Sequence, residues 1–580
     1  MKPQYPSGFC PRNLFQWAFL FFLFSLFSSP QLWAALQDAV KAGVVSRDLE
    51  KREESKIQKQ NIPEIQVQEE EGAIAPESNE KVFIQAIRFK GNASLSEKKL
   101  RTLARPYIQK EQSLSDLRKL ALTVQNYYRK KGYFLARVSI PPQEIDDGVL
   151  EMVISEGKVG KLTIRGNKRY KKDFIRRYFW NLDKGETIKY SHLLRPMMLL
   201  NENPSLQVSA TLTKGEEPGT SDITLDVKEK FPIRTYFTYD NGGSDFVSKH
   251  RMGTAIEMDG LLFQGDRSSL DFVAGSPFHS LMFASANYSA PIDHSGARAE
   301  FGYQYSEFQA ARELRDLGVE GRSQVFHTGL TQALLRTRST RMDTGLSFDY
   351  KQIKNFILRS RVSDDELRVV NFDLSVDHVD KFHGHTYLNN RFSIALAGIM
   401  GATQSNSPAA SRSKAGGPFL LYQPDFKRVQ QLPWDTYLIG RFRGQIASDV
   451  LPASEEMVLG GIDTVRGYSQ GEHLGDDGYI INVELRIPPP LIGSWEIPYL
   501  HQNLKSTLQL AGFFDHGTVF RRAASGQSPF DTIASVGMGL RFFLPHDWNV
   551  SLDWGFPISG NASSTGSVSE FYIKLNSRIL

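Results

Sequence analysis

Apolar and polar positions alternate in segment after segment from Ile233 to the C-terminus. In residues 437–446 the even positions are apolar or small, whereas the odd positions carry charge by the middle of the segment. Residues 391–396 and 549–554 alternate in the same way. A period of two places successive side chains on opposite faces of a strand. This part of the chain is therefore predicted to consist of β-strands joined by turns and loops.

A soluble β-sandwich would also alternate, but three further features favour a transmembrane barrel. No helical pattern interrupts residues 232–580, aromatic residues recur near the predicted strand ends, and an apolar N-terminal run precedes them. A barrel in lipid is apolar outside and polar within. At about 10 residues per strand plus turns and loops, this length predicts about 16 antiparallel strands.

The N-terminus carries the only long apolar run, Leu14–Phe27, preceded by Lys2 and Arg12. This run is shorter than the roughly 20 residues that span a membrane as a helix. We therefore expect a cleaved signal peptide over residues 1–34, with an uncleaved anchor as the alternative. Cys10 is the only cysteine, so the remaining chain is expected to form neither a disulfide nor a thiolate metal site.

Two segments separate the predicted signal peptide from the first folded unit. Residues 35–60 lack proline and carry offset opposite charges among good helix formers, which predicts a solvated helix. Residues 61–80 contain Pro63 and Pro76 and show no apolar periodicity, which predicts a linker.

An internal repeat follows over residues 81–158 and 159–231, and each half is predicted to fold as β-α-α-β-β. The halves contain the similar stretches Phe89–Asn92 and Ile164–Asn167. In the first half, a helix is predicted from an N-cap at Ser115 to Lys131. Its buried stripe is predicted to be Leu117, Leu120, Val124 and Tyr127 or Tyr128.

Two motifs in the predicted barrel indicate a charge pair inside it. Val465-Arg466-Gly467-Tyr468 reads as a loop in which Gly467 permits close backbone approach and Tyr468 offers an apolar body with a hydroxyl. Phe513-Phe514-Asp515-His516-Gly517 reads as a strand with Asp515 on its inward face. The alternative is a loop whose arginine faces water.

Both motifs resemble those of the two-partner secretion transporters of the haemolysin and haemagglutinin secretion-activation type. These transporters belong to the outer-membrane superfamily of proteins with POTRA domains and a barrel. Further stretches carry the resemblance, in chain order: Tyr127–Ser139, Glu156-Gly157, Asn203-Pro204, Val227-Lys228-Glu229, Asp240-Asn241-Gly242-Gly243, Gly265-Asp266 and Tyr288-Ser289.

The resemblance implies an all-β transmembrane barrel in the bacterial outer membrane, preceded by two α+β POTRA domains in the periplasm over residues 81–158 and 159–231. It implies that residues 35–60 can plug the pore. It also implies that the loop around Arg466 folds back into the lumen, where Arg466 meets Asp515. Glu484, predicted inward on its own strand, is a competing partner.

The implied function is secretion of one large partner exoprotein, which the POTRA domains would bind by adding a strand to a sheet edge. Outer-membrane lipid and the barrel-assembly machinery are the other expected partners. An outer-membrane insertase and a passive channel remain alternatives.

The sequence offers no enzymatic chemistry, so neither catalytic residues nor a cofactor are expected. A P-loop, an H-E-x-x-H helix and paired metal-binding cysteines are all absent. His383 and His385 form the only close histidine pair, without further evident ligands for a metal. The net charge of +5 is small and dispersed, which argues against nucleic-acid binding.

Overall fold

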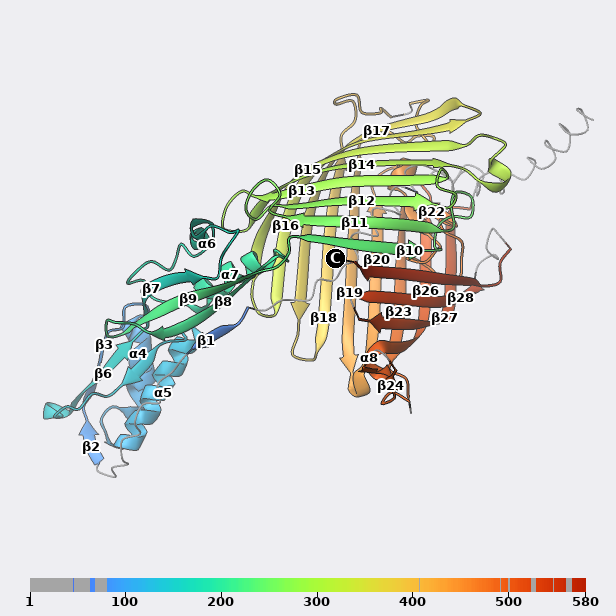
Figure 1. The fold of residues 1–580 in the computed structure, drawn as a ribbon. Helices are drawn as coiled ribbons and strands as arrows, with labels where there is room; N and C mark the ends of the chain where they lie inside the picture. The colour runs from blue at the N-terminus through green and yellow to red at the C-terminus, as the bar shows by residue number, and fades with distance from the viewer. Residues whose placement is uncertain are drawn as a thin grey trace, which may run out of the picture.

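The chain forms two small α/β units followed by a closed barrel (Figure 1). The computed structural model describes residues 45, 63–67 and 81–579, apart from gaps at 406, 491, 499–500, 523–527, 546 and 560–565. The predicted signal peptide, plug helix and linker therefore lie outside the described residues, except for Val45 and residues 63–67. Val45 is helical and packs against an apolar cluster of the barrel that includes Phe283 and Ile353.

Within the described parts of the chain, no helix has the length and apolar character needed to cross a membrane.

The first unit has the predicted β-α-α-β-β order around one apolar core. Its main elements are β3 (Ala86–Lys90), α4 (Glu97–Ala104), α5 (Leu114–Lys130), β5 (Arg137–Ser139) and β6 (Val149–Ser155). The sheet order is β3-β6-β5, and β2 (Lys81–Ile84) pairs separately with β4 (Lys110–Ser113).

Helix α5 begins two residues earlier than predicted, because Ser113 and not Ser115 is its N-cap. The Ser113 hydroxyl accepts a hydrogen bond from the Asp116 N–H at 3.2 Å, and the Asp116 carboxylate accepts one from the Ser113 N–H at 3.4 Å. This reciprocal capping box satisfies two backbone donors that Ser115 could not reach. Of the two candidate tyrosines, Tyr128 is the buried one, and its hydroxyl donates to Glu156 at 3.1 Å.

The second unit repeats this order. Its elements are β7 (Lys158–Arg165), α6 (Lys172–Tyr178), α7 (Tyr190–Asn201), β8 (Leu206–Lys214) and β9 (Thr220–Glu229), in the sheet order β8-β9-β7. Strand β7 starts at Lys158, the last residue predicted for the first unit.

The repeated glycines explain why both halves share the same stretch. Gly91 and Gly166 have φ of +90° and +82°. A Cβ at either would lie 2.3 Å from a backbone carbonyl, that of Ile154 or Val227. Both positions therefore need glycine for its conformation and for its size.

A short strand was not predicted in residues 61–80. Strand β1 (Ile65–Val67) pairs in parallel with β8, opposite residues 210–212. Ile65 packs against the core of the second unit. Three residues with one inward apolar side chain are too few for a period to be recognised in the sequence.

The barrel has 16 antiparallel strands, which confirms the predicted fold class. In order around the wall they are β10 (Ile233–Asp240), β11 (Arg251–Asp259), β12 (Arg267–Gly275), β13 (Leu281–Pro291), β14 (Ala297–Gln309), β15 (Glu320–Arg336), β16 (Thr340–Ile357), β17 (Ser360–Val379), β18 (Gly384–Ala395), β19 (Phe419–Leu432), β20 (Thr436–Ala447), β23 (Asp477–Ile487), β26 (Leu508–Phe520), β27 (Phe530–Leu544), β28 (Trp548–Ser559) and β29 (Glu570–Arg578). Pairing of β10 with β29 closes the wall.

Small elements decorate the connections. Strands β21 (Met457–Leu459) and β22 (His473–Gly475) pair within the loop between β20 and β23. Strands β24 (Glu496–Ile497) and β25 (Gln502–Asn503) and helix α8 (Leu504–Thr507) lie between β23 and β26.

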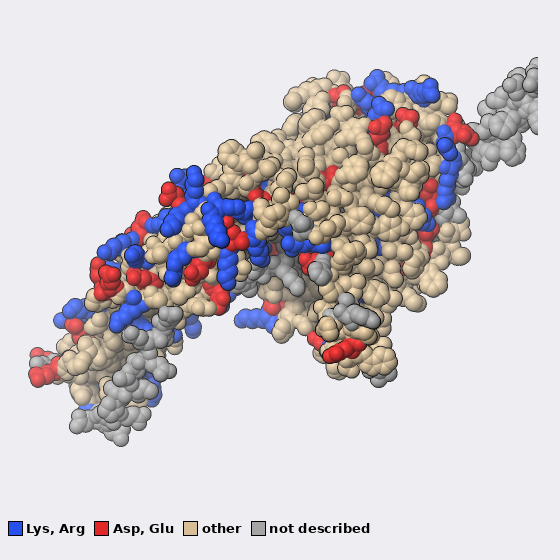
Figure 2. All heavy atoms as spheres, in the orientation of Figure 1, with Lys and Arg blue, Asp and Glu red and all other residues tan. Residues whose placement is uncertain are grey.

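The alternation places apolar side chains on the outer face of the wall and polar ones in the lumen. Figure 2 shows an outer wall that is largely uncharged, with charged side chains gathered elsewhere. Exposed residues of the outer face include Leu270, Phe272, Phe301, Phe326, Leu346, Phe372, Phe392, Leu438, Phe514 and Trp554. Buried polar residues of the strands include Ser285, Ser306, Asn371, Ser393, Gln445, Glu484, Asp515, Arg541 and Asp553.

The second unit is docked against one end of the barrel. The Arg195 guanidinium donates to the carbonyl of Ser295 at 3.0 Å, in the connection that follows β13, and to that of Ala333 at 2.7 Å, near the end of β15. Arg336 forms an ion pair with Glu202 at 2.5 Å. We call the end of the barrel that carries these contacts the unit-facing end. Because the strands are antiparallel, successive connections alternate between the two ends, and the connection between β20 and β23 lies at the opposite end.

Candidate functional site

Residues 448–476, called the long loop here, join β20 to β23 and turn back into the barrel. Near the tip of this loop, Arg466 is 7 % exposed and its guanidinium lies 3.4 Å from the centre of the Phe513 ring. The charge is therefore held between an aromatic face and the polar residues of the inner wall.

Arg466 is bound to Asp515 on β26 by three hydrogen bonds. Its Nε donates to Oδ2 at 2.7 Å, its Nη2 donates to Oδ1 at 3.0 Å, and its backbone N–H donates to Oδ2 at 3.2 Å. Asp515 is fully buried. The planar guanidinium matches the carboxylate with two parallel donors, a geometry that lysine cannot reproduce.

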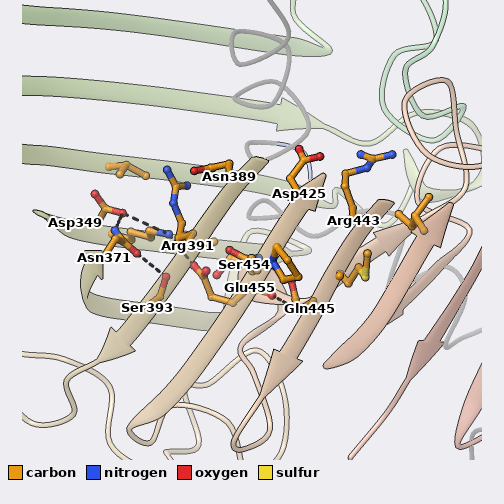
Figure 3. A pocket seen from close by; sticks show the side chains of 18 of the residues that line it. Asp349, Asn371, Asn389, Arg391, Ser393, Asp425, Arg443, Gln445, Ser454 and Glu455 are labelled. Carbon is orange, nitrogen blue, oxygen red and sulfur yellow. Dashed lines mark hydrogen bonds and ion pairs between the residues drawn. The ribbon is translucent and has the colours of Figure 1, made fainter. Parts of the chain in front are cut away.

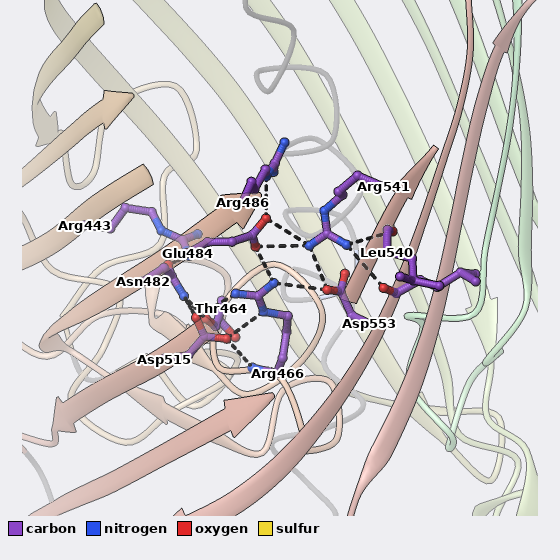
Figure 4. A network of polar contacts seen from close by, with 11 residues as sticks. Arg443, Thr464, Arg466, Asn482, Glu484, Arg486, Asp515, Leu540, Arg541 and Asp553 are labelled. Carbon is purple, nitrogen blue, oxygen red and sulfur yellow. Dashed lines mark hydrogen bonds and ion pairs between the residues drawn. The ribbon is translucent and has the colours of Figure 1, made fainter. Parts of the chain in front are cut away.

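Further charged residues surround this pair (Figure 4). The Arg466 Nη1 also donates to Glu484 at 2.8 Å and approaches Asp553 at 3.4 Å. The Arg541 Nη2 bridges the same two carboxylates, at 3.0 Å from Glu484 and 2.7 Å from Asp553. We call these five residues, Arg466, Glu484, Asp515, Arg541 and Asp553, the lumen ion cluster.

Glu484, the predicted competing partner, binds Arg466 together with Asp515. The guanidinium has donors on more than one edge, so it binds both carboxylates at once. Glu484 in turn accepts from Arg486 at 2.6 Å, which supplies a further positive charge.

Sequence reasoning missed Arg541 and Asp553. Each lies on the inward face of a strand whose outward neighbours are exposed, such as Met538 and Trp554. Their periodic position was visible in the sequence. Their meeting depends on the order of four strands and on the path of the loop, which a local pattern does not contain.

The neighbours of Arg466 fix the loop through its backbone. Gly467 has a φ of +93°, and a Cβ there would lie 2.9 Å from the carbonyl carbon of Gly555 on β28. The Gly467 N–H donates to the Tyr572 hydroxyl at 3.1 Å, and that hydroxyl donates to the Tyr468 carbonyl at 2.8 Å. The Tyr468 hydroxyl donates to the carbonyl of Ala534 at 3.1 Å and also contacts that of Ser559.

The remaining predicted site residues pack around the loop. Val465 is fully buried in an apolar cluster with Leu459 and Ile480. A Cβ at Gly517 would lie 2.3 Å from Leu459 Cδ1, so the small residue on β26 leaves room for this side chain of the loop. The structure thus brings both motifs together in the lumen.

The sequence of Gly467–Gly471 matches the G-x-S-x-G pattern of hydrolase nucleophile elbows. In those enzymes the serine occupies a sharp turn between a strand and a helix. Here Ser469 is half-buried in a loop that continues into β22. The match is therefore incidental to the loop motif.

The base of the long loop is tied to other parts of the barrel. Arg412, in the connection between β18 and β19, forms an ion pair with Asp476 at 2.6 Å. Burial opposes ionisation of Asp476, but the hydrogen bond and charge of Arg412 outweigh it and hold the pKa of that carboxyl below its usual value. Across the lumen, Lys351 pairs with Glu455 of the loop at 2.9 Å. The loop is thus held at its base as well as at its tip.

Beside the long loop, the lumen contains a polar cavity of about 140 Å³ (Figure 3). Its lining includes Asp349, Asn371, Arg391, Asp425 and Gln445. These groups offer both donors and acceptors of hydrogen bonds.

Among the described residues, no group of His, Cys, Asp and Glu is arranged to hold a metal ion. His385 contacts Asp377 through its Nε2.

Comparison with known proteins places this architecture in a family. Residues 219–542, more than half of the 580, match the haemolysin secretion/activation protein family ShlB/FhaC/HecB. Residues 82–157, the first unit, match the POTRA domain of ShlB type.

Individual relatives are similar over most of their length. The heme/hemopexin transporter protein HuxB of Haemophilus influenzae (strain 86-028NP) is 24% identical over 81% of this chain and 82% of HuxB. The outer membrane transporter CdiB of Dickeya dadantii (strain 3937) is 22% identical over 72% of this chain and 73% of CdiB. The solved structure of CdiB from Escherichia coli has the same fold, with a TM-score of 0.71 and 16% identity over 95% of this chain and 99% of that one. The chain therefore belongs to the haemolysin secretion/activation protein family ShlB/FhaC/HecB, the outer-membrane transporters of two-partner secretion.

Proposed function

We propose that this protein binds one large exoprotein, of haemolysin or adhesin type, in the periplasm through its two α/β units. It then passes the unfolded exoprotein through the barrel to the cell surface. Outer-membrane lipid surrounds the barrel wall, and the barrel-assembly machinery inserts it during biogenesis. The proposed recognition step rests on a single observation, the pairing of β1 with β8.

The β8 edge is a backbone surface that accepts an added strand. Strand β1 pairs with it in parallel, with Gln66 opposite Thr211, and Ile65 packs toward the core. A strand of an unfolded exoprotein can use the same backbone groups, with one apolar side chain in the place of Ile65. Such recognition depends little on side chains, which suits capture of a long chain at many positions.

We propose that the lumen ion cluster positions the long loop. A buried ion pair adds little net stability, because desolvation offsets most of the attraction, yet it selects one arrangement strongly. Arg466 reaches carboxylates on three strands, β23, β26 and β28. The loop is thereby fixed to one side of the lumen, and the polar cavity beside it is the proposed path of the exoprotein.

We attribute the drive for secretion to folding of the exoprotein outside the cell and to directional strand addition. Neither a nucleotide nor a membrane potential is expected at the outer membrane. The chain is proposed to contribute positioning alone and no covalent chemistry.

An insertase of the same superfamily is the second candidate. Those relatives usually carry more than two POTRA domains, whereas two α/β units precede the barrel among the residues described here. The unit count favours the transporter.

Mass spectrometry of the culture medium and outer membrane, with and without the gene, tests the proposal. Loss of one large exoprotein from the medium, with other barrel proteins unchanged, is the expected result. Depletion of many barrel proteins would support the insertase instead. If neither fraction changes, the transporter proposal is wrong.

A further inference from the structure

The unit-facing end of the barrel carries a ring of exposed aromatic side chains. Phe382 is 79 % exposed, Trp434 is 87 % exposed and Trp495 is 66 % exposed, each in a connection at this end. Phe263, in the connection between β11 and β12, and Trp548, the first residue of β28, continue the ring. Aromatic residues in such girdles lie where the hydrocarbon of a membrane meets its headgroups. The ring therefore marks the level of the membrane surface that faces the periplasm.

The connection between β11 and β12 presents three consecutive large apolar side chains at this level. Leu261, Leu262 and Phe263 are 54 %, 66 % and 67 % exposed. The buried Asp266 carboxylate accepts the backbone N–H groups of all three, at 2.8, 2.8 and 2.7 Å. The Tyr288 hydroxyl donates to the same carboxylate at 2.9 Å. The side chains are thus held outward by a rigid turn.

Helix α6 of the second unit is docked on this turn. The Lys171 N–H donates to the Gln264 side chain at 3.3 Å, and that side chain donates to the Arg169 carbonyl at 3.1 Å. A Cβ at Gly265 would lie 2.8 Å from the ring of Phe174, so the helix packs directly against the turn. Through these contacts α6 lies at the level of the aromatic ring.

The outer face of α6 is basic and carries a tryptophan. Lys171, Lys172 and Arg177 are exposed, and Trp180 is 67 % exposed just beyond the helix. Asp173 is the acidic residue on this face. Figure 2 shows Lys and Arg side chains gathered over this part of the second unit, beside the barrel end where Figure 1 places α6.

We propose that the turn 260–266 and helix α6 form a membrane-surface anchor for anionic phospholipid. Leu261, Leu262 and Phe263 insert into the leaflet that faces the periplasm and extend the lipid-facing wall of the barrel. The headgroup phosphates bind Lys171, Lys172 and Arg177. An apolar insertion beside clustered basic residues is the combination that binds anionic membrane surfaces. The anchor fixes the orientation of the second unit relative to the membrane.

Fluorescence quenching in the full chain tests the anchor. Cys10 is the only cysteine, so a Cys10→Ser, Asn181→Cys protein takes one fluorophore next to Trp180. The protein is placed in vesicles of phosphatidylcholine with or without phosphatidylglycerol, each containing a lipid with a nitroxide on its headgroup. We expect stronger quenching when phosphatidylglycerol is present.

A charge reversal and its matched control sharpen the test. Lys171→Glu, Lys172→Glu and Arg177→Glu together should reduce the quenching to its level in phosphatidylcholine alone. Reversal of the exposed residues Lys98, Lys99 and Lys130 to Glu, on the first unit, changes the net charge equally and should leave the quenching unchanged. Quenching that ignores phosphatidylglycerol in the unaltered protein, or that falls equally in both variants, would overturn the anchor.

Discussion

The lumen ion cluster and the β8 edge hold two added segments in place by opposite means. In the cluster, the long loop is fixed by side chains, above all by Arg466, whose guanidinium contacts Asp515, Glu484 and Asp553. On the β8 edge, β1 is held by parallel backbone pairing with one apolar side chain turned inward. The first contact is made by specific side chains, whereas the second is made mainly by backbone groups.

This difference fits the two proposed tasks. A loop that must occupy one position needs contacts that fail when any member changes. A receptor for a long unfolded chain needs contacts that tolerate many sequences. Single substitutions should therefore be severe in the cluster and mild on the edge.

Arg466→Ala should have the largest effect. It leaves Asp515 buried without its main partner, and breaking a buried pair in this way costs about 3–5 kcal/mol. Export of the exoprotein should fall close to zero while the barrel remains in the outer membrane. The readouts are exoprotein in the medium and the heat-dependent gel mobility of the barrel.

Arg428→Ala is the matched control, because Arg428 pairs with Asp380 at 2.7 Å, outside the cluster and outside the lining of the polar cavity. It should leave most export intact. Equal losses in the two variants would remove the distinction between the cluster and the rest of the lumen.

Gly467→Ala should be the next most severe change. The new Cβ would lie 2.9 Å from the Gly555 backbone, so the loop tip must shift away from β28. Gly471→Ala provides the control, since Gly471 also has a positive φ, of +75°, but has open space around it. Both variants carry backbone strain of about 1–2 kcal/mol. Only Gly467→Ala should greatly reduce export into the medium.

A disulfide between β1 and β8 should block export in part and reversibly. Gln66 and Thr211 are paired residues, and neighbouring strands bring Cα atoms within the span of a disulfide. Oxidised Gln66→Cys, Thr211→Cys protein should bind and export less exoprotein, and a reductant should restore both. Thr211→Cys with Thr224→Cys links β8 to β9 instead and should have no effect. Full export with β1 locked in place would show that the exoprotein does not use this edge.

Thr211→Ala should have the smallest effect. The side chain lies at the edge, but the backbone makes the pairing, so the stability change should stay within about 0.5 kcal/mol. Export measured over time should match that of the unaltered protein. A loss comparable to that of Arg466→Ala would mean that side chains, not backbone, determine recognition.

The difference between side-chain contacts and backbone contacts also explains which features could be predicted from the sequence. Strand alternation is local, so the 16-strand barrel and the inward position of Asp515 were predictable. The role of Arg541 depends on β27 lying beside β26 and β28, which no local pattern records. Strand β1 was missed because its pairing with β8 is made by backbone atoms that every residue has. A site built from particular side chains can be recognised in the sequence, whereas a site built from backbone atoms cannot.

The most direct test of the central claim is a double-mutant cycle on Arg466 and Asp515, measured as exoprotein released into the medium. Arg466→Lys and Asp515→Asn each weaken the bidentate contact without emptying the site, so export should fall but remain measurable. If the pair acts as one unit, the double variant exports about as much as the weaker single variant. If the two losses multiply, Arg466 and Asp515 act independently, and the proposed positioning of the long loop by their contact is contradicted.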